Sequence, residues 1–313
     1  MRISRRTTLL GAAAVAASWA APSARADAKL FNLVDDDTRG ALGERDLLES
    51  GISEDHLRSA MADFIFPDNA DDGKPYGIDV SHHTKNVPWA DLHAVKCQYV
   101  YVKASQASRG VDERFVEHWK NATSIANVPV GAYHFLCPRI PGEDQAKFFL
   151  SRVVQVDGVA DGNLQPVVDL EWDTYGPDFK RVVSGYDKKK RPIYKDYWLD
   201  EKPSDIVAVV QGFVDQLRAQ VGSHIVPRIY TNRTWWHSVL GDKVRFNDCK
   251  IWISDYRKAS FDSQQPQSVV GHEYDLWQFS ETGRIRASKG PLVGPFDCNK
   301  LSRGALSDLI ISQ

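Results

Sequence analysis

Two carboxylates lie two residues apart in the apolar run VVDLE, which spans residues 167–171. Valine and leucine favour a buried strand here, and side chains two residues apart in a strand point to the same face. Asp169 and Glu171 would therefore share one face of the strand. Because neighbouring carboxylates repel each other, the less solvated one keeps its proton to higher pH, as a general acid requires. The pair indicates acid–base catalysis, although this spacing of acids also arises often by chance.

Two more acids occupy comparable places. Asp79 lies near the end of the strand-like run YGIDVS (76–81), and Asp297 lies within FDCN (296–299). If these runs are the first and last strands of a closed barrel, they are neighbours, and both acids flank the mouth that holds the first pair. The alternative for each is a helix cap or a surface ion pair. Four acids converging from three strands form a more specific pattern than one pair.

From Tyr76 onward the chain alternates strand-like and helix-like segments. The predicted strands are 77–81, 98–104, 130–136, 166–171, 226–230, 250–254, 274–279 and 296–299. The predicted helices are 112–126, 142–156 and 204–220, the last capped by Ser204 and closed by Gly222. Repeated β–α units and eight strands favour an α/β, TIM-like barrel with an irregular last part. An open doubly wound sheet is the alternative, which is weakened because no glycine-rich nucleotide loop follows the first strand.

The first 26 residues have the pattern of an export signal. Arg2, Arg5 and Arg6 form a charged start, an alanine-rich apolar stretch follows, and ARA (24–26) is a small-x-small cleavage site. The pair Arg5-Arg6 resembles the twin-arginine signal of bacteria, with a general secretory signal as the alternative. The stretch is too short and too rich in alanine for a good membrane span, so we predict no span and a periplasmic or extracellular location.

Two further segments differ from the strand–helix pattern. Residues 27–75 are acidic, and we interpret them as an N-terminal extension before a hydrolase domain that spans residues 76–313. Within this extension one amphipathic helix is predicted, from its cap Ser53 to Phe66. The connection 173–203 is long and rich in tyrosine, lysine and aspartate, and loops of this length are usually functional or disordered. Its aromatic residues argue against disorder, so we expect it to shape a substrate groove.

Composition limits the function classes. The formal net charge of −2 gives no indication of a nucleic-acid binder. The cysteines show no zinc-type spacing and are interpreted as buried thiols, with one disulfide open if the protein is exported. They are Cys97, Cys137, Cys249 and Cys298. His82, His83 and His134 lack the further ligands that a metal site needs, so neither a metal nor a cofactor is predicted, and the oligomeric state is left open.

Seven motifs, in order along the chain, resemble those of glycoside hydrolase family 25, the Chalaropsis-type lysozymes. They are GIDVS (77–81), VKAS (102–105), GAYHF (131–135), DLE (169–171), IW (251–252), WQF (277–279) and DCN (297–299). The resemblance covers residues 76–301 and implies an irregular barrel of five β/α units followed by three strands. The chain departs from the usual family pattern after the IW motif, where it reads Ser254-Asp255-Tyr256, and in the length of the insertion after Trp172.

The resemblance also implies an activity and residue roles. The activity is that of an N-acetylmuramidase, which hydrolyses the β-1,4 bond between N-acetylmuramic acid and N-acetylglucosamine in peptidoglycan glycan strands. Glu171 would be the acid/base and Asp169 its partner, with Asp79 and Asp297 in support. Candidates for binding the glycan are Lys103, Tyr133, Trp252 and Gln278. Each has a structural alternative: a surface lysine, core aromatics, and an amide with a fixed partner.

Two retaining mechanisms fit this substrate. The 2-acetamido group of the sugar can attack the anomeric carbon and form an oxazolinium ion, or Asp169 can attack directly and form a covalent intermediate. The sequence does not decide between them, and we favour substrate assistance. A non-catalytic glycan-binding protein of the cell envelope, and a hydrolase of another amino-sugar polymer such as chitin, are the alternative functions.

Overall fold

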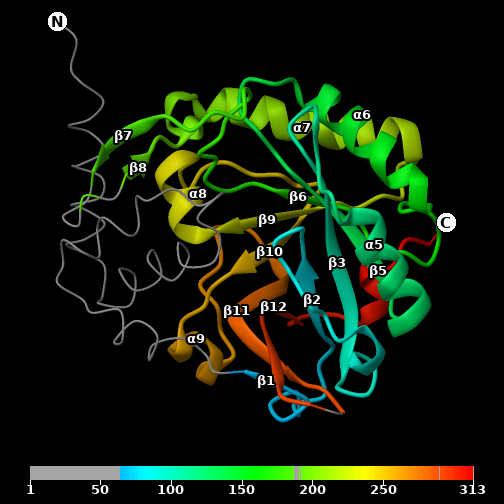
Figure 1. Cartoon of the computed structure of the whole chain (residues 1–313). Helices are drawn as coiled ribbons and strands as arrows, with labels where there is room; N and C mark the ends of the chain where they lie inside the picture. The colour runs from blue at the N-terminus through cyan, green and yellow to red at the C-terminus, as the bar shows by residue number, and fades with distance from the viewer. Residues whose placement is uncertain (1–63, 187–189, 191, 289, 313) are drawn as a thin grey trace, which may run out of the picture.

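The computed structural model describes residues 64–312 with the exception of 187–189, 191 and 289. At its centre eight strands close into a barrel, and the helices lie outside it (Figure 1). Around the barrel these strands are β2 (Tyr76–Val80), β3 (Cys97–Gln106), β5 (Val130–Phe135), β6 (Val167–Asp169), β9 (Arg228–Asn232), β10 (Lys250–Ser254), β11 (Tyr274–Arg286) and β12 (Leu292–Leu301). Each corresponds to a predicted strand, and the predicted α/β barrel is confirmed.

The barrel is closed by a strand of opposite direction. Neighbouring strands from β2 to β11 pair in parallel, whereas β12 pairs antiparallel with β11 on one side and with β2 on the other. Only a few residues join β11 to β12, and a connection that short permits an antiparallel pair but no crossover. The first and last barrel strands are therefore neighbours, as the sequence predicted.

The longest helix is α7, and the two helices after it are short. They are α5 (Phe115–Asn121, continued by a π turn over Ala122–Ala126), α6 (Gly142–Val153), α7 (Pro203–Val221), α8 (Arg233–Val239) and α9 (Lys258–Ser263). Single 3-10 turns cover Trp89–Asp91, Val154–Val156, Tyr197–Asp200 and Leu306–Leu309. The predicted cap Ser204 is wrong: Lys202 precedes the first turn of α7 and Pro203 begins it, because the fixed φ of proline suits the first helical position. Gly222 ends α7 as predicted, with φ 137°.

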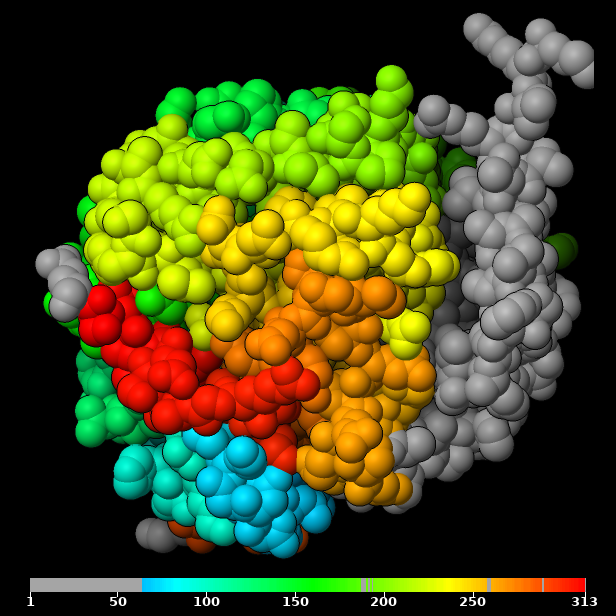
Figure 2. Space-filling model, turned by 180° about the vertical axis from the view of Figure 1, so that it is seen from behind, coloured from blue at the N-terminus to red at the C-terminus, as the bar shows by residue number. Residues whose placement is uncertain are grey.

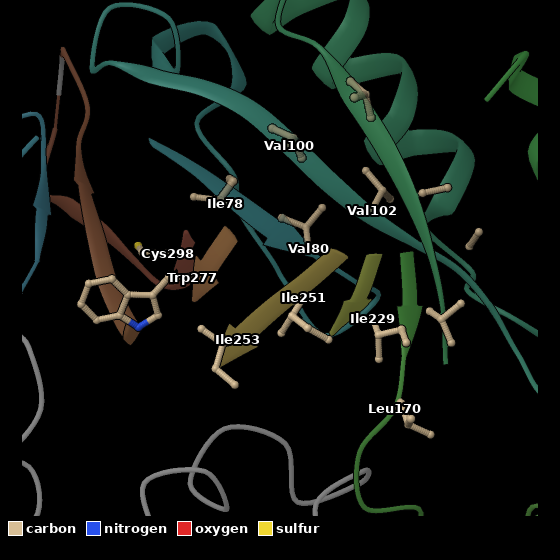
Figure 3. Packing of buried hydrophobic residues seen from close by; sticks show 14 of the residues in the cluster. Ile78, Val80, Val100, Val102, Leu170, Ile229, Ile251, Ile253, Trp277 and Cys298 are labelled. Carbon is tan, nitrogen blue, oxygen red and sulfur yellow. The ribbon is translucent and has the colours of Figure 1, made fainter. Parts of the chain in front are cut away.

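The barrel strands bury both of their faces. Ile78, Val100 and Ile251 belong to the large cluster of apolar side chains outside the barrel wall (Figure 3), where the helices cover them. The alternate residues Tyr99 and Tyr101 fill the interior instead. Gly77 and Gly131 make room for these two rings, because a Cβ at either glycine would lie 2.4 Å from a tyrosine ring atom. The two strands that flank β3 thus keep glycine where the rings of β3 fill the interior.

An ion pair and the C-terminal segment close the base of the barrel, at the amino ends of β6 and β9. Arg228 is 2% exposed, and its Nη2 donates to Oδ2 of Asp275 over 2.7 Å. The chain after β12 then crosses this end, where the amide of Gln165 donates to the carbonyl of Leu309 over 2.7 Å. Figure 2 shows these C-terminal residues, in red, directly beside the first described residues, in blue. Residues of this same chain therefore close this end of the barrel.

The described part of the predicted N-terminal extension belongs to the core. Residues 1–63, which hold the predicted export signal and most of the predicted helix, lie outside the described residues. The end of that helix is wrong, because Ile65–Phe66 form strand β1, which pairs in parallel with β11. Phe64 and Phe66 are fully buried, and the ring of Phe64 packs 4.7 Å from that of Phe279. Pairing with the long β11 takes precedence over the amphipathic pattern at this point.

The connection 173–203 has structure of its own. It carries the hairpin of β7 (Val183–Tyr186) and β8 (Pro192–Tyr194), which the sequence did not predict, while β4 (Gly110–Val111) folds back on β3 nearby. Arg139 anchors the end of the connection through ion pairs of 2.7 Å with Asp200 and with Glu201. Within the described residues, no helix is long and apolar enough to span a bilayer. The four cysteines are free thiols, three of them buried.

Candidate active site

A pocket of about 150 Å³ opens at the carboxyl ends of the barrel strands. All eight residues proposed from the sequence line it: Asp79, Lys103, Tyr133, Asp169, Glu171, Trp252, Gln278 and Asp297. They come from seven different segments of the chain, so the closed barrel is what brings them together. Their catalytic and binding roles remain predictions.

The Asp169–Glu171 pair enters the pocket from the end of β6. Although the strand itself ends at Asp169, its backbone pairing continues, because the amide of Leu170 donates to the carbonyl of Tyr230 over 2.9 Å. Val168 and Leu170 therefore face the outer apolar cluster, and the two acids face the pocket. Asp169 is 7% exposed and Glu171 3%. The extended backbone thus presents two nearly buried carboxylates side by side at the mouth.

Asp79 and Asp297 flank the mouth on the other side. They are Cα partners across the antiparallel pair of β2 and β12. One oxygen of Asp79, Oδ2, accepts two amide hydrogen bonds of 2.7 Å, from Nε2 of Gln278 and from Nδ2 of Asn299. Two donors on one oxygen favour the ionised form of a carboxyl group.

Aromatic side chains donate hydrogen bonds to the oxygens of these two amides. The indole Nε1 of Trp252 donates to Oδ1 of Asn299 over 3.0 Å. Oε1 of Gln278 accepts from the hydroxyl of Tyr230 over 2.7 Å and from that of Tyr256. Trp252 is only 2% exposed and packs against the rings of Tyr101 and Tyr230, so it forms the floor of the pocket.

Lys103 and Tyr133 lie on the neighbouring strands β3 and β5. Lys103 is 5% exposed, which excludes the surface-lysine alternative, and its ammonium lies 4.9 Å from the ring centre of Phe135. Burial raises the pKa of the Tyr133 phenol well above its usual value near 10, and neighbouring carboxylates, first Asp79 and then Asp169, raise it further. The phenol therefore stays protonated at neutral pH and can donate a hydrogen bond there.

Sequence reasoning missed a fifth acid of the pocket. Glu281 is 2% exposed and lines the pocket beside Phe296 and Asp297. Strict alternation from Gln278 would turn Glu281 to the outer face, but β11 has register shifts on both sides of Ser280. An irregularity of this kind turns the following side chains to the opposite face, and no residue pattern marks it in the sequence.

The histidines near the pocket have partners within the protein. Nδ1 of His134 lies 2.9 Å from the hydroxyl of Ser105, and Nε2 lies 3.2 Å from the side-chain oxygen of Gln145. Burial lowers the pKa of His134 to about 3, which keeps its ring neutral. Nδ1 of His82 lies 2.8 Å from Asp112, which anchors the segment after β2. Across the described ranges, no group of three or more His, Cys, Asp or Glu side chains is placed to hold a metal ion.

A closed α/β barrel that gathers carboxylates at the carboxyl ends of its strands is the architecture of a barrel glycoside hydrolase. The sequence supports this class independently, since the family model "Glycosyl hydrolases family 25" matches residues 78–287. The chain belongs to this family and is a glycosidase.

Two relatives resemble the chain in sequence, and solved structures share its fold. The chain is 26% identical to Lysozyme M1 of Streptomyces globisporus over 241 residues, which cover 75% of this chain and 70% of that protein. It is 25% identical to the N,O-diacetylmuramidase of Chalaropsis sp over 234 residues, covering 73% and 99%. The bacterial lysozyme of Streptomyces coelicolor superposes with a TM-score of 0.57 at 24% identity, covering 76% of this chain and 96% of that one. The family 25 lysozyme of Aspergillus fumigatus has the same TM-score and identity, with 75% and 97% covered. The two structures support the fold.

Proposed function

We propose that this glycosidase is a peptidoglycan hydrolase that cleaves the β-1,4 bond between N-acetylmuramic acid and N-acetylglucosamine. The observation that carries the proposal is the Asp169–Glu171 pair, held nearly buried in a pocket with Asp79 and Asp297. The names of the relatives, lysozyme and N,O-diacetylmuramidase, support this substrate.

In the proposed reaction Glu171 protonates the leaving glycosidic oxygen and then activates water. Its low exposure favours the protonated form that a general acid needs. Asp169 orients the 2-acetamido group of the substrate and balances the positive charge of an oxazolinium ion, which gives retention of configuration. The rival route is direct attack by Asp169, and a covalent sugar trapped on this residue would establish it.

The other lining residues are proposed to bind the glycan. Lys103 and Tyr133 present donors from β3 and β5, which lie between β2 and β6 in the barrel. Trp252 forms an apolar floor, and Gln278 acts through Asp79, to which its amide is bonded. The described residues of the connection 173–203 do not line the pocket. The effect of this connection on glycan preference therefore remains a prediction, and it would require a substrate groove that extends beyond the pocket.

Mass spectrometry of digested, purified peptidoglycan tests the proposal directly. A muramidase releases fragments with N-acetylmuramic acid at the new reducing end, and the matched variant Glu171→Gln should release almost none. Fragments that end in N-acetylglucosamine would refute the bond assignment. Turnover of chitin alone would favour the other polymer, and binding without turnover by the wild type would favour a silent glycan-binding protein.

We further propose that residues 1–26 direct export by the twin-arginine route, which would bring the enzyme to the cell wall. Replacing Arg5 and Arg6 by lysine should retain the precursor in the cytoplasm, and normal export of this variant would argue for a general secretory signal. The extension is proposed to be dispensable for chemistry only as far as residue 63, because Phe64 and Phe66 belong to the core.

A further inference from the structure

Two amide side chains share one oxygen of Asp79, and the direction of each amide can be read from its partners. We call Gln278 and Asn299 the amide pair; they lie opposite each other on β11 and β12, are 2% and 0% exposed, and both face the barrel interior. An amide side chain can be turned by 180° with little change in shape, so its orientation depends on the groups that it meets.

The orientation of Asn299 is fixed by a partner that can only donate. An indole N–H has no acceptor function, so the group of Asn299 that faces Trp252 must be its oxygen. The nitrogen of Asn299 then faces Asp79 and donates to it.

The orientation of Gln278 is set by Asp79 on one side and by two hydroxyls on the other. Tyr230 and Tyr256 both donate to its Oε1, which uses both lone pairs of that oxygen. The reversed amide would place Oε1 against Oδ2 of Asp79, which is repulsive unless Asp79 carries a proton. We call Tyr230, Tyr256 and Trp252 the aromatic donors.

We propose that the aromatic donors are positioning residues, which orient the amide pair so that Asp79 remains an anion throughout turnover and cannot act as the general acid. The orientation itself is independent of the substrate; only its effect on turnover rests on the proposed function. Asp79 then supplies fixed negative charge beside the reacting sugar, and the acid role is left to the Asp169–Glu171 pair.

Other charged and titratable groups line the same pocket as Asp79, and they come from the elements packed around it. They are Asp297 on β12, Lys103 on β3, Tyr133 on β5, Asp169 and Glu171 at β6, Glu281 on β11 and His83 after β2. Most of these are acids, whose repulsion favours protonation of Asp79. Oriented amide donors are therefore needed to keep the proton off this residue.

A carboxyl ¹³C NMR titration of the apo enzyme, labelled at aspartate and assigned with Asp79→Asn, tests the proposal without any substrate. We expect the Asp79 signal to keep its carboxylate position from pH 8 to pH 4 in the wild type. In the double variant Tyr230→Phe/Tyr256→Phe, which leaves the Gln278 amide able to turn, the titration midpoint should rise by about one pH unit or more. Tyr101→Phe is the matched control, because this buried hydroxyl donates to the carbonyl of Gln165 instead of the amide pair.

Kinetics on solubilised peptidoglycan provide the second readout. The acid limb of the kcat/KM profile should move to higher pH in the double variant while the alkaline limb stays in place. Lower activity with an unmoved acid limb and an unchanged NMR titration would show that the tyrosines are merely structural and overturn the proposal. If the double variant does not fold, each single variant still removes one donor and should move the midpoint in the same direction. A wild type that shows the expected NMR behaviour but no hydrolysis would refute the proposed function and leave this inference intact.

Discussion

At the base of the barrel Arg228 and Asp275 form a two-point ion pair, with Nη2–Oδ2 2.7 Å and Nε–Oδ1 3.2 Å, under the C-terminal segment. Burial alone would lower the pKa of Arg228, but the charge of Asp275 more than offsets this and raises it. At the mouth positive and negative charges are not matched in this way. The acids that line the pocket are Asp79, Asp169, Glu171, Glu281 and Asp297, and Lys103 is the one lysine or arginine among the lining residues.

The difference between the two ends separates stability from function. A buried charge is costly unless a partner compensates it, and the base meets this requirement within the chain. The mouth keeps an excess of negative charge, which suits a glycosidic transition state that develops positive charge at the anomeric carbon. Changes at the base should therefore affect the free energy of unfolding, and changes at the mouth should affect the rate.

The largest effect is expected at the mouth, from Glu171→Gln. This variant keeps the shape but removes the transferable proton, so kcat/KM on natural glycans should fall about 10²–10⁴-fold. An aryl glycoside with a good leaving group needs less protonation, and its first step should be slowed much less. The control Asp169→Asn should slow both substrates, because it removes charge balance. Equal losses on both substrates in Glu171→Gln would remove this residue from the acid role.

The base should respond to Arg228→Met with a loss of stability. Removing one partner of a buried pair leaves Asp275 uncompensated, and we expect the free energy of unfolding in urea to fall by about 3–5 kcal/mol. The double variant Arg228→Met/Asp275→Asn should recover much of this loss. Activity per folded molecule should stay within about twofold of the wild type, since the pair lies at the opposite end from the carboxylates. A collapse of activity in a folded variant would mean that the two ends are coupled.

His134 is buried as a neutral ring and not as part of an ion pair. Its effect on the free energy of unfolding is smaller and depends on pH. The pKa of His134 is about 3 in the folded protein and near 6.5 in an unfolded chain, so unfolding takes up a proton between these values. Its contribution is complete above pH 6.5 and decreases as the pH falls towards 3. Between pH 7.5 and pH 5 the wild type should lose about 2 kcal/mol more than His134→Gln in urea unfolding. Parallel pH dependences of the two proteins would contradict this.

The smallest effect is expected from Glu281→Gln. It removes one charge from the mouth without removing any group that transfers a proton, so kcat/KM should fall about three- to tenfold. Thr282→Gln, at the exposed neighbouring position on β11, is the control and should leave the rate unchanged. A gain in rate for Glu281→Gln would show that the excess charge at the mouth opposes the reaction.

The barrel could be predicted because its signals are local. The run 250–254 was predicted residue for residue, since alternating isoleucines beside Trp252 fix both the strand and its two faces. The same alternation placed Asp169 and Glu171 together. Helix ends were less certain, as the start of α7 shows, because Ser204 and Pro203 both favour a helix start.

The features that were missed depend on contacts between distant parts of the chain. Arg228 and Asp275 are 47 residues apart, and no local pattern marks them as partners. The turn of Glu281 into the pocket follows from irregular pairing between β11 and β12, and strand β1 exists because β11 extends far enough to meet it. Tyr230 and Tyr256 likewise were not predicted for the site, and their proposed role becomes visible only through the Gln278 amide that they contact.

The antiparallel seam between β2 and β12 has a consequence for when the enzyme becomes active. Asn299 and Asp79 are 220 residues apart in the chain, and contacts of such separation form late because a long loop must first be closed. A nascent or truncated chain that lacks β12 has neither Asp297 nor the Asn299 amide. Hydrolytic activity therefore requires the complete barrel. A chain that lacks β12 should not cleave the glycan.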